Sequence, residues 1–239
     1  MARGIAIYHF DTPEGGFSYV IERRPKRRTV GIQVCPDGMV LVAAHPLVPH
    51  LYVKRLLRDK AAWVQRKLAD AAVYNQERNS RGYAEGDCIT YLGREYRLRF
   101  AGRSRLDKET GELHLGMRGE PHREAVIASL TRWYKRQAKV VLCERTRLLT
   151  ERIGKQPTLI GIKSYRSRWG SCHRDGRIYF NWRLVMAPMD VIDYVVAHEL
   201  CHLVHHNHSP AFWEQVAKLF PDFTEQRRWL RRQGRLLDL

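Results

Sequence analysis

Two histidines and a glutamate lie close together in the segment His198-Glu199-Leu200-Cys201-His202. If this segment is helical, the two histidines leave one helix face about 6 Å apart along the axis, so their ring nitrogens can converge on one metal ion. Glu199 follows the first histidine directly, where its carboxylate can reach a metal-bound water without binding the metal. The pattern therefore predicts a hydrolytic metal site with Glu199 as the general base.

A catalytic zinc site usually has three protein ligands, and three further histidines follow the motif. A helix that continues through His205 carries that side chain away from the metal. His208 lies just before Ser209-Pro210, a typical helix start, so a chain reversal there can bring it back. We therefore expect His208 to be the third ligand and His205 and His206 to be solvated.

The expected metal helix, residues 190–205, is largely apolar. Burying two histidines and a glutamate on such a helix without a partner costs free energy, and a metal ion removes that cost. The alternative is a pair of hydrogen-bonded core histidines beside a surface glutamate, which this apolar setting disfavours.

Four segments resemble one known family. They are HELCHLVHHNH at His198–His208, SRWGSC at Ser167–Cys172, NWR at Asn181–Arg183, and Phe212-Trp213. Together they are similar to the YgjP-type metallopeptidase-like family, also called domain of unknown function 45, a neighbour of the SprT-like zinc proteases. The resemblance runs from about Phe17 to Arg231.

The resemblance implies a zinc ion held by His198, His202 and His208, with Glu199 as the base. It also implies a compact zincin-like core made of a helix, a small sheet and the metal helix. Some family members carry a different attribution, UTP pyrophosphatase activity, so the resemblance leaves the substrate open.

The segment before the strand expected at 178–182 has two interpretations. Arg166 or Arg168 can face an anionic substrate or a developing oxyanion, or both arginines can anchor a turn. We expect Trp169 and Cys172 to pack beneath the metal helix. No feature of the sequence indicates a lowered pKa for Cys172, so a cysteine nucleophile has no support.

The hydrophobic pattern predicts a β-rich first half and a helical second half. Expected strands are 17–24, 29–35, 39–44, 88–92, 95–100, 113–115, 158–164 and 178–182, and expected helices are 49–75, 121–152, 190–205, 210–219 and 223–233. We expect an α+β fold, and the family resemblance implies a gluzincin-type zincin core within it. We place a β-rich region with one long helix at 1–118 and the catalytic core at 119–239, and the resemblance treats about 17–231 as one continuous family unit.

The chain carries 42 Lys and Arg against 25 Asp and Glu, a net charge of +17. Such a field attracts polyanions, but a generally basic surface without a dedicated ligand explains it equally well. The arginine-rich segment that includes Arg227 and Arg231 fits a solvated helix face better than a nucleic-acid contact. Trp213, Phe223 and Trp229 are expected in the core of the closing helices.

Cysteine content and hydropathy restrict the class of protein. The five cysteines are odd in number and form no CxxC pair, which argues against a disulfide framework and a zinc ribbon. The sequence has no run of 18 apolar residues, and its first residues lack the apolar stretch and the cleavage site typical of a signal peptide. We therefore expect a cytoplasmic protein without a membrane partner.

These observations predict a zinc-dependent hydrolase, with a metallopeptidase acting on protein or peptide as the favoured interpretation. One alternative is a nucleotide pyrophosphatase on the same metal, acting on a nucleoside triphosphate whose phosphates arginines neutralise. Another is a nucleic-acid-binding or scaffold protein whose zinc is structural. A site closed by four protein ligands would favour the scaffold.

Overall fold

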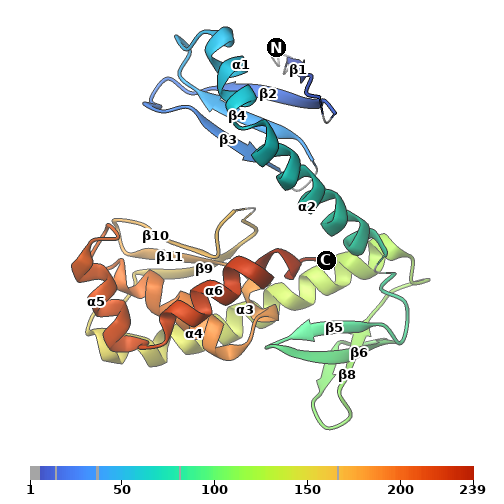
Figure 1. Cartoon of the computed structure of the whole chain (residues 1–239). Helices are drawn as coiled ribbons and strands as arrows, with labels where there is room; N and C mark the ends of the chain where they lie inside the picture. The colour runs from blue at the N-terminus through green and yellow to red at the C-terminus, as the bar shows by residue number, and fades with distance from the viewer. Residues whose placement is uncertain (1–5, 14, 36–37, 81, 166) are drawn as a thin grey trace. The chain divides into compact units, whose positions relative to one another are not determined.

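The computed structural model describes residues 6–13, 15–35, 38–80, 82–165 and 167–239. Contacts divide the chain into two compact units, residues 1–81 and 82–239, whose elements are drawn in Figure 1. Each unit has its own hydrophobic core. This division differs from the boundary expected near residue 118. The strands between 88 and 116 belong to the second unit because Leu98, Leu113 and Leu115 are buried in the same core as Trp133 and Tyr134.

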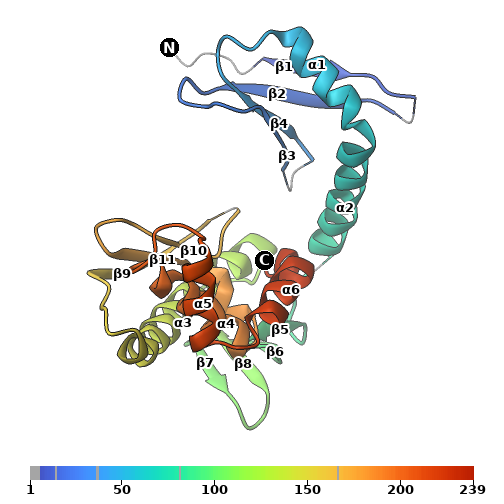
Figure 2. The same ribbon diagram turned by 60° about the vertical axis from the view of Figure 1, so that its left-hand side comes forward.

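The first unit is a four-stranded sheet with two helices (Figure 2). Its strands are β1 (Ile7–Phe10), β2 (Phe17–Arg23), β3 (Gly31–Val34) and β4 (Val40–Ala44), in the order β1-β2-β4-β3. Its helices are α1 (His50–Asp59) and α2 (Ala61–Ser80). Val40 and Val42 of β4 pack in one core with Val53 and Leu57 of α1.

For this unit, one sequence expectation is wrong, one strand was missed and one strand pair is confirmed. The single helix expected at 49–75 is two helices, because the backbone leaves helical geometry at Lys60 (φ −109°, ψ 9°). The strand β1 was not expected. The strands expected at 29–35 and 39–44 are confirmed as β3 and β4, which pair antiparallel. The turn that Pro36-Asp37-Gly38 favours between them lies partly outside the described residues.

The second unit begins with a sheet of β5 (Cys88–Tyr91), β6 (Arg94–Ala101), β7 (Arg105–Asp107) and β8 (Glu112–Gly116), in the order β5-β6-β8-β7. The strands expected at 88–92 and 95–100 are confirmed as β5 and β6, which pair antiparallel through a turn at Gly93, whose φ is 74°. A β-carbon at Gly93 would lie 2.8 Å from the Cα of Pro188, so this position also requires a close backbone approach.

Helix α3 (Arg123–Ile153) is the longest element of the second unit. It begins after His122, whose ring accepts a hydrogen bond from the Ala125 N–H. It ends at Gly154 in the left-handed conformation, close to the end expected at residue 152. A second sheet follows, made of β9 (Leu159–Lys163), β10 (Gly170–Cys172) and β11 (Arg177–Asn181) in the order β10-β11-β9. The strand β10 was not among the expected strands.

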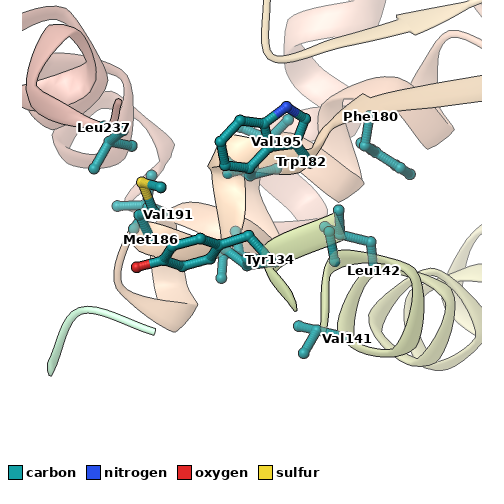
Figure 3. Close-up of a cluster of buried hydrophobic side chains, with 14 of the residues drawn as sticks. Tyr134, Val141, Leu142, Phe180, Trp182, Met186, Val191, Val195 and Leu237 are labelled. Atoms are coloured by element: carbon teal, nitrogen blue, oxygen red, sulfur yellow. The ribbon is translucent and has the colours of Figure 1, made fainter. Parts of the chain in front are cut away.

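The remaining elements are η1 (Trp182–Met186), α4 (Met189–Cys201), α5 (Pro210–Leu219), α6 (Phe223–Gln233) and η2 (Gly234–Leu236). Figure 3 shows part of the core of this unit, a cluster that contains Tyr134 and Leu142 of α3 together with Val191 and Val195 of α4. Among the described residues, no helix has the length and apolar character needed to cross a membrane.

Helix α4 is held firmly because almost all of its side chains are buried. A two-pronged ion pair adds to this packing: Arg145 of α3 donates to both carboxylate oxygens of Asp193, over 2.6 and 2.7 Å. The helix ends at Cys201 and not at His205 as expected. The N–H of Leu203 bonds to the carbonyl of Leu200, which tightens the last turn and stops the helix.

Candidate metal centre

The structure brings His198, His202 and His208 together. One ring nitrogen from each lies within 4.8 Å of the other two. His198 and His202 come from the end of α4, and His208 comes from the connection before α5. That connection ends where expected, because the Ser209 hydroxyl accepts a hydrogen bond from the Phe212 N–H and Pro210 begins the helix.

Neighbouring groups orient the three rings. The Nδ1 of His202 lies 2.9 Å from the backbone carbonyl of His205 and donates to it, which leaves Nε2 available as a ligand. His202 stacks on Phe212 with ring centres 4.4 Å apart, and His208 stacks on Trp213 at 5.6 Å. The Nε2 atoms of His198 and His208 face each other at 3.2 Å.

These residues fit a zinc ion. Burial lowers the pKa of His198 to about 3, and the charges of His202 and His208 act in the same direction. Burial also lowers the pKa of His202. Both imidazoles are therefore neutral at neutral pH, which is the form that binds a metal. Among the described residues, no cysteine or carboxylate joins the three histidines, so the ligand set has the composition of an open site.

Glu199 is buried beside this cluster, against strand β10. A β-carbon at Gly170 would lie 2.5 Å from both the Cγ and the Oε1 of Glu199, so the strand passes directly over its side chain. Burial raises the pKa of Glu199 to about 8, while the Arg168 charge and a hydrogen bond with the Cys172 backbone act in the opposite direction. The glycine makes room for the carboxylate, and the neighbouring backbone orients it.

Of the two arginines considered from sequence, Arg166 lies outside the described residues. The guanidinium of Arg168 lies 5.7 Å from the centre of the Tyr165 ring, and its charge reaches Glu199. Asn181 holds this connection in place, because its side-chain N–H groups donate to the carbonyls of Tyr165 and Arg168 at 3.0 and 3.2 Å.

The sequence did not predict that aromatic rings stack beside the histidines. Trp213 lies between His208 and Phe223, with its ring nearly parallel to both. The guanidinium of Arg227 lies 4.9 Å from the centre of the same indole, and its charge acts on His198. Trp213 therefore borders the site, and Arg227 is more than a solvated residue. Its position in an arginine-rich helix carried no signal that could distinguish it from its neighbours.

Trp169 and Cys172 are partly buried against the main core of the second unit, as expected. Burial raises the pKa of the Cys172 thiol to about 11, and that of Cys201 to about 12. Both groups are therefore thiols at neutral pH, so neither is an activated nucleophile.

Comparisons with known proteins identify one family. The family model for the YgjP-like metallopeptidase domain matches residues 28–233. Among solved structures, the zymogen of the metallopeptidase abylysin from Pyrococcus abyssi is similar at 21% identity and a TM-score of 0.36, covering 38% of this chain and 93% of the other. No curated protein matches the sequence.

Proposed function

The chain belongs to the YgjP-like metallopeptidase family, and on this premise we propose that it is a zinc-dependent peptidase that hydrolyses peptide bonds with Glu199 as the general base. The observation that carries the proposal is the convergence of three imidazoles within 4.8 Å, next to one buried carboxylate. This is the donor set and the base that metal-assisted amide hydrolysis requires.

His198, His202 and His208 would hold the metal. A zinc ion bound there supplies a water of lowered pKa and a Lewis acid for the scissile carbonyl. The hydrogen bond from His202 Nδ1 to the His205 carbonyl would keep the ligand nitrogen aimed at the metal. We further propose that α3, the β10-β11-β9 sheet and α4 form the zincin-like core.

Glu199 must be ionised to act as the base, and the positive charge of a zinc ion bound beside it would favour that form over the raised pKa of the metal-free site. Glu199 would then take a proton from the attacking water and pass it to the leaving amine. Its side chain is enclosed by Gly170 and by the backbone at Cys172, so its carboxylate is positioned before substrate arrives. The positive charge of Arg168 acts on Glu199, and we assign Arg168 to the anionic oxygen that develops on the substrate carbonyl.

The alternatives from the sequence have less support. A structural zinc site needs four protein ligands, and the described residues provide a cluster of three. The matched family model is described as a metallopeptidase domain, which favours a peptide substrate over a nucleotide.

The decisive experiment compares Glu199→Gln with the wild type on a denatured, fluorescently labelled protein substrate. Loss of the general base should lower kcat by about 100-fold or more, while zinc content stays at the wild-type value. Glu214→Gln is the matched control, because Glu214 lies on the neighbouring helix α5 and is exposed. Wild-type turnover by Glu199→Gln, or absence of peptidase activity in the zinc-loaded wild type, would refute the proposal.

A further inference from the structure

A second site lies in the other half of the second unit, in a hollow of about 850 Å³. Helix α3 forms one side, and the segments 102–104 and 116–118 beside β6, β7 and β8 form the other. We propose that this hollow binds an oligophosphate, a linear chain of phosphoryl groups that is either free or part of a nucleotide.

Four arginines line the hollow: Arg103, Arg118, Arg132 and Arg136. All four are exposed, and among the described residues none of them forms an ion pair with a carboxylate. The lining contains no aspartate or glutamate. Guanidinium groups match phosphate oxygens in geometry and charge, so four of them without acidic partners favour a multiply charged anion.

Two serines in the wall add hydrogen-bond donors. The Ser104 hydroxyl accepts from the Gly116 N–H at 2.9 Å, and the Ser129 hydroxyl accepts from Arg132 at 2.7 Å. Each hydroxyl oxygen is thus used as an acceptor, and its own hydrogen can point to a phosphate oxygen.

The length of the hollow and its one lining tryptophan favour a phosphate chain over a nucleic-acid strand. The lining residues of α3 run from Ala125 to Val140, about 22 Å along the helix, which leaves room for several phosphoryl groups. Trp133 also lines the hollow, but it is buried and packs edge-on against Tyr91 and Tyr134. Its ring is therefore occupied, whereas strand-binding proteins stack bases on exposed aromatic rings.

This site is separate from the metal centre. The lining residues of α3 end at Val140. The C-terminal end of α4 contacts the segment just after α3, where Lys155 donates a hydrogen bond to the carbonyl of Leu203. The 13 residue steps from Val140 to Ile153 span about 20 Å of helix. An oligophosphate in the hollow therefore does not contact the metal ligands.

The test is a calorimetric titration of the zinc-loaded full chain with inorganic triphosphate. Arg132→Gln/Arg136→Gln removes two charges from the hollow, and Arg147→Gln/Arg152→Gln removes two from the same helix outside it. The first variant should bind at least about tenfold more weakly, and the control should stay within about twofold of the wild type. Zinc content is measured after each titration, so that removal of the metal is distinguished from binding.

Three further ligands identify the source of the phosphates: a nucleoside triphosphate, a single-stranded oligonucleotide and citrate. Equal affinity for inorganic and nucleoside triphosphate supports a site for the phosphate chain alone, and tighter nucleotide binding that the hollow variant abolishes supports a nucleotide. The proposal is overturned if triphosphate does not bind, if both arginine variants weaken binding equally, or if citrate or the oligonucleotide binds more tightly than triphosphate.

Discussion

His205 can contribute to the proposed metal site without being a ligand, because it orients His202. The backbone carbonyl of His205 accepts from His202 Nδ1, so His205 contributes its main chain and not its ring. His208, three residues later, returns to within hydrogen-bond distance of His198. The proposed division of roles among these histidines therefore depends on backbone geometry after the helix end.

Replacing His208 by alanine should strip the zinc, whereas His205→Ala and His206→Ala should retain it. Loss of a direct ligand should reduce zinc affinity by more than the roughly 10–100-fold typical of an outer partner. The His205→Ala variant keeps the carbonyl that orients His202. Zinc stoichiometry after dialysis against a weak chelator measures this, and metal loss in His205→Ala with retention in His208→Ala would contradict the ligand assignment.

The cysteines offer a second test at the same scale. Burial raises the pKa of Cys172 to about 11, so the protonated form dominates below that pH. At pH 7.5 fewer than about one in a thousand Cys172 groups is a thiolate. Iodoacetamide should therefore modify the exposed Cys88 well before Cys172 in the folded protein, as followed by mass spectrometry. The rate at Cys172 should rise with pH, and equal rates for the two at pH 7.5 would show an activated thiol.

Much of the candidate site could be predicted from residue types alone. The spacing of His198 and His202 is a local property of a helix, so the sequence is sufficient to predict that their rings share one face. The stack of His208, Trp213 and Arg227 could not be predicted, because it joins a connection to two helices through contacts between distant parts of the chain.

At the scale of elements, strand β10 and helix α4 pack so closely beside the site that there is no room for a side chain on the strand. Strand β10 crosses Glu199 at Gly170, where any side chain would overlap the Glu199 carboxylate. Glycine here is required by close packing and not by backbone conformation, since its φ is not positive.

Gly170→Ala should therefore displace Glu199 and lower peptidase activity by about 10–100-fold, because a misplacement near 1 Å can cost this much. Zinc content should remain at the wild-type value, since the atoms nearest to a β-carbon at Gly170 all belong to Glu199 and not to a histidine. Gly102→Ala is the control, because a β-carbon there meets nothing within 4 Å. Activity and zinc content are measured on both variants, and full activity in Gly170→Ala would remove the contact from the proposed mechanism.

Element boundaries show what local patterns miss. The ends of α3, α5 and α6 agree with the sequence expectation to within about two residues, because a capping group or an apolar period marks each one. The end of α4 and the break at Lys60 have no such marker. Strands β1, β7 and β10 have four residues or fewer, too short for a reliable alternation of apolar and polar residues.

At the scale of the whole molecule, the family match from 28 to 233 spans parts of both units, but the proposed chemistry lies within one. All of the proposed zinc ligands, Glu199 and Arg168 belong to residues 82–239. Each unit also has a separate cluster of buried side chains, with no residue common to the two. The second unit therefore contains both a hydrophobic core and the complete candidate site.

This separation predicts that residues 82–239, expressed alone, fold cooperatively and bind one zinc ion per chain. The reason is that packing between α3, α4 and the β5-β6-β8-β7 sheet buries the apolar surface of this unit without residues 1–81. Thermal unfolding followed by circular dichroism, together with zinc stoichiometry, tests the fragment against the full chain. A fragment carrying His208→Ala should fold but lose zinc, which separates folding from metal binding. An unfolded fragment, or a folded one without zinc, would show that the first unit is needed to complete the second.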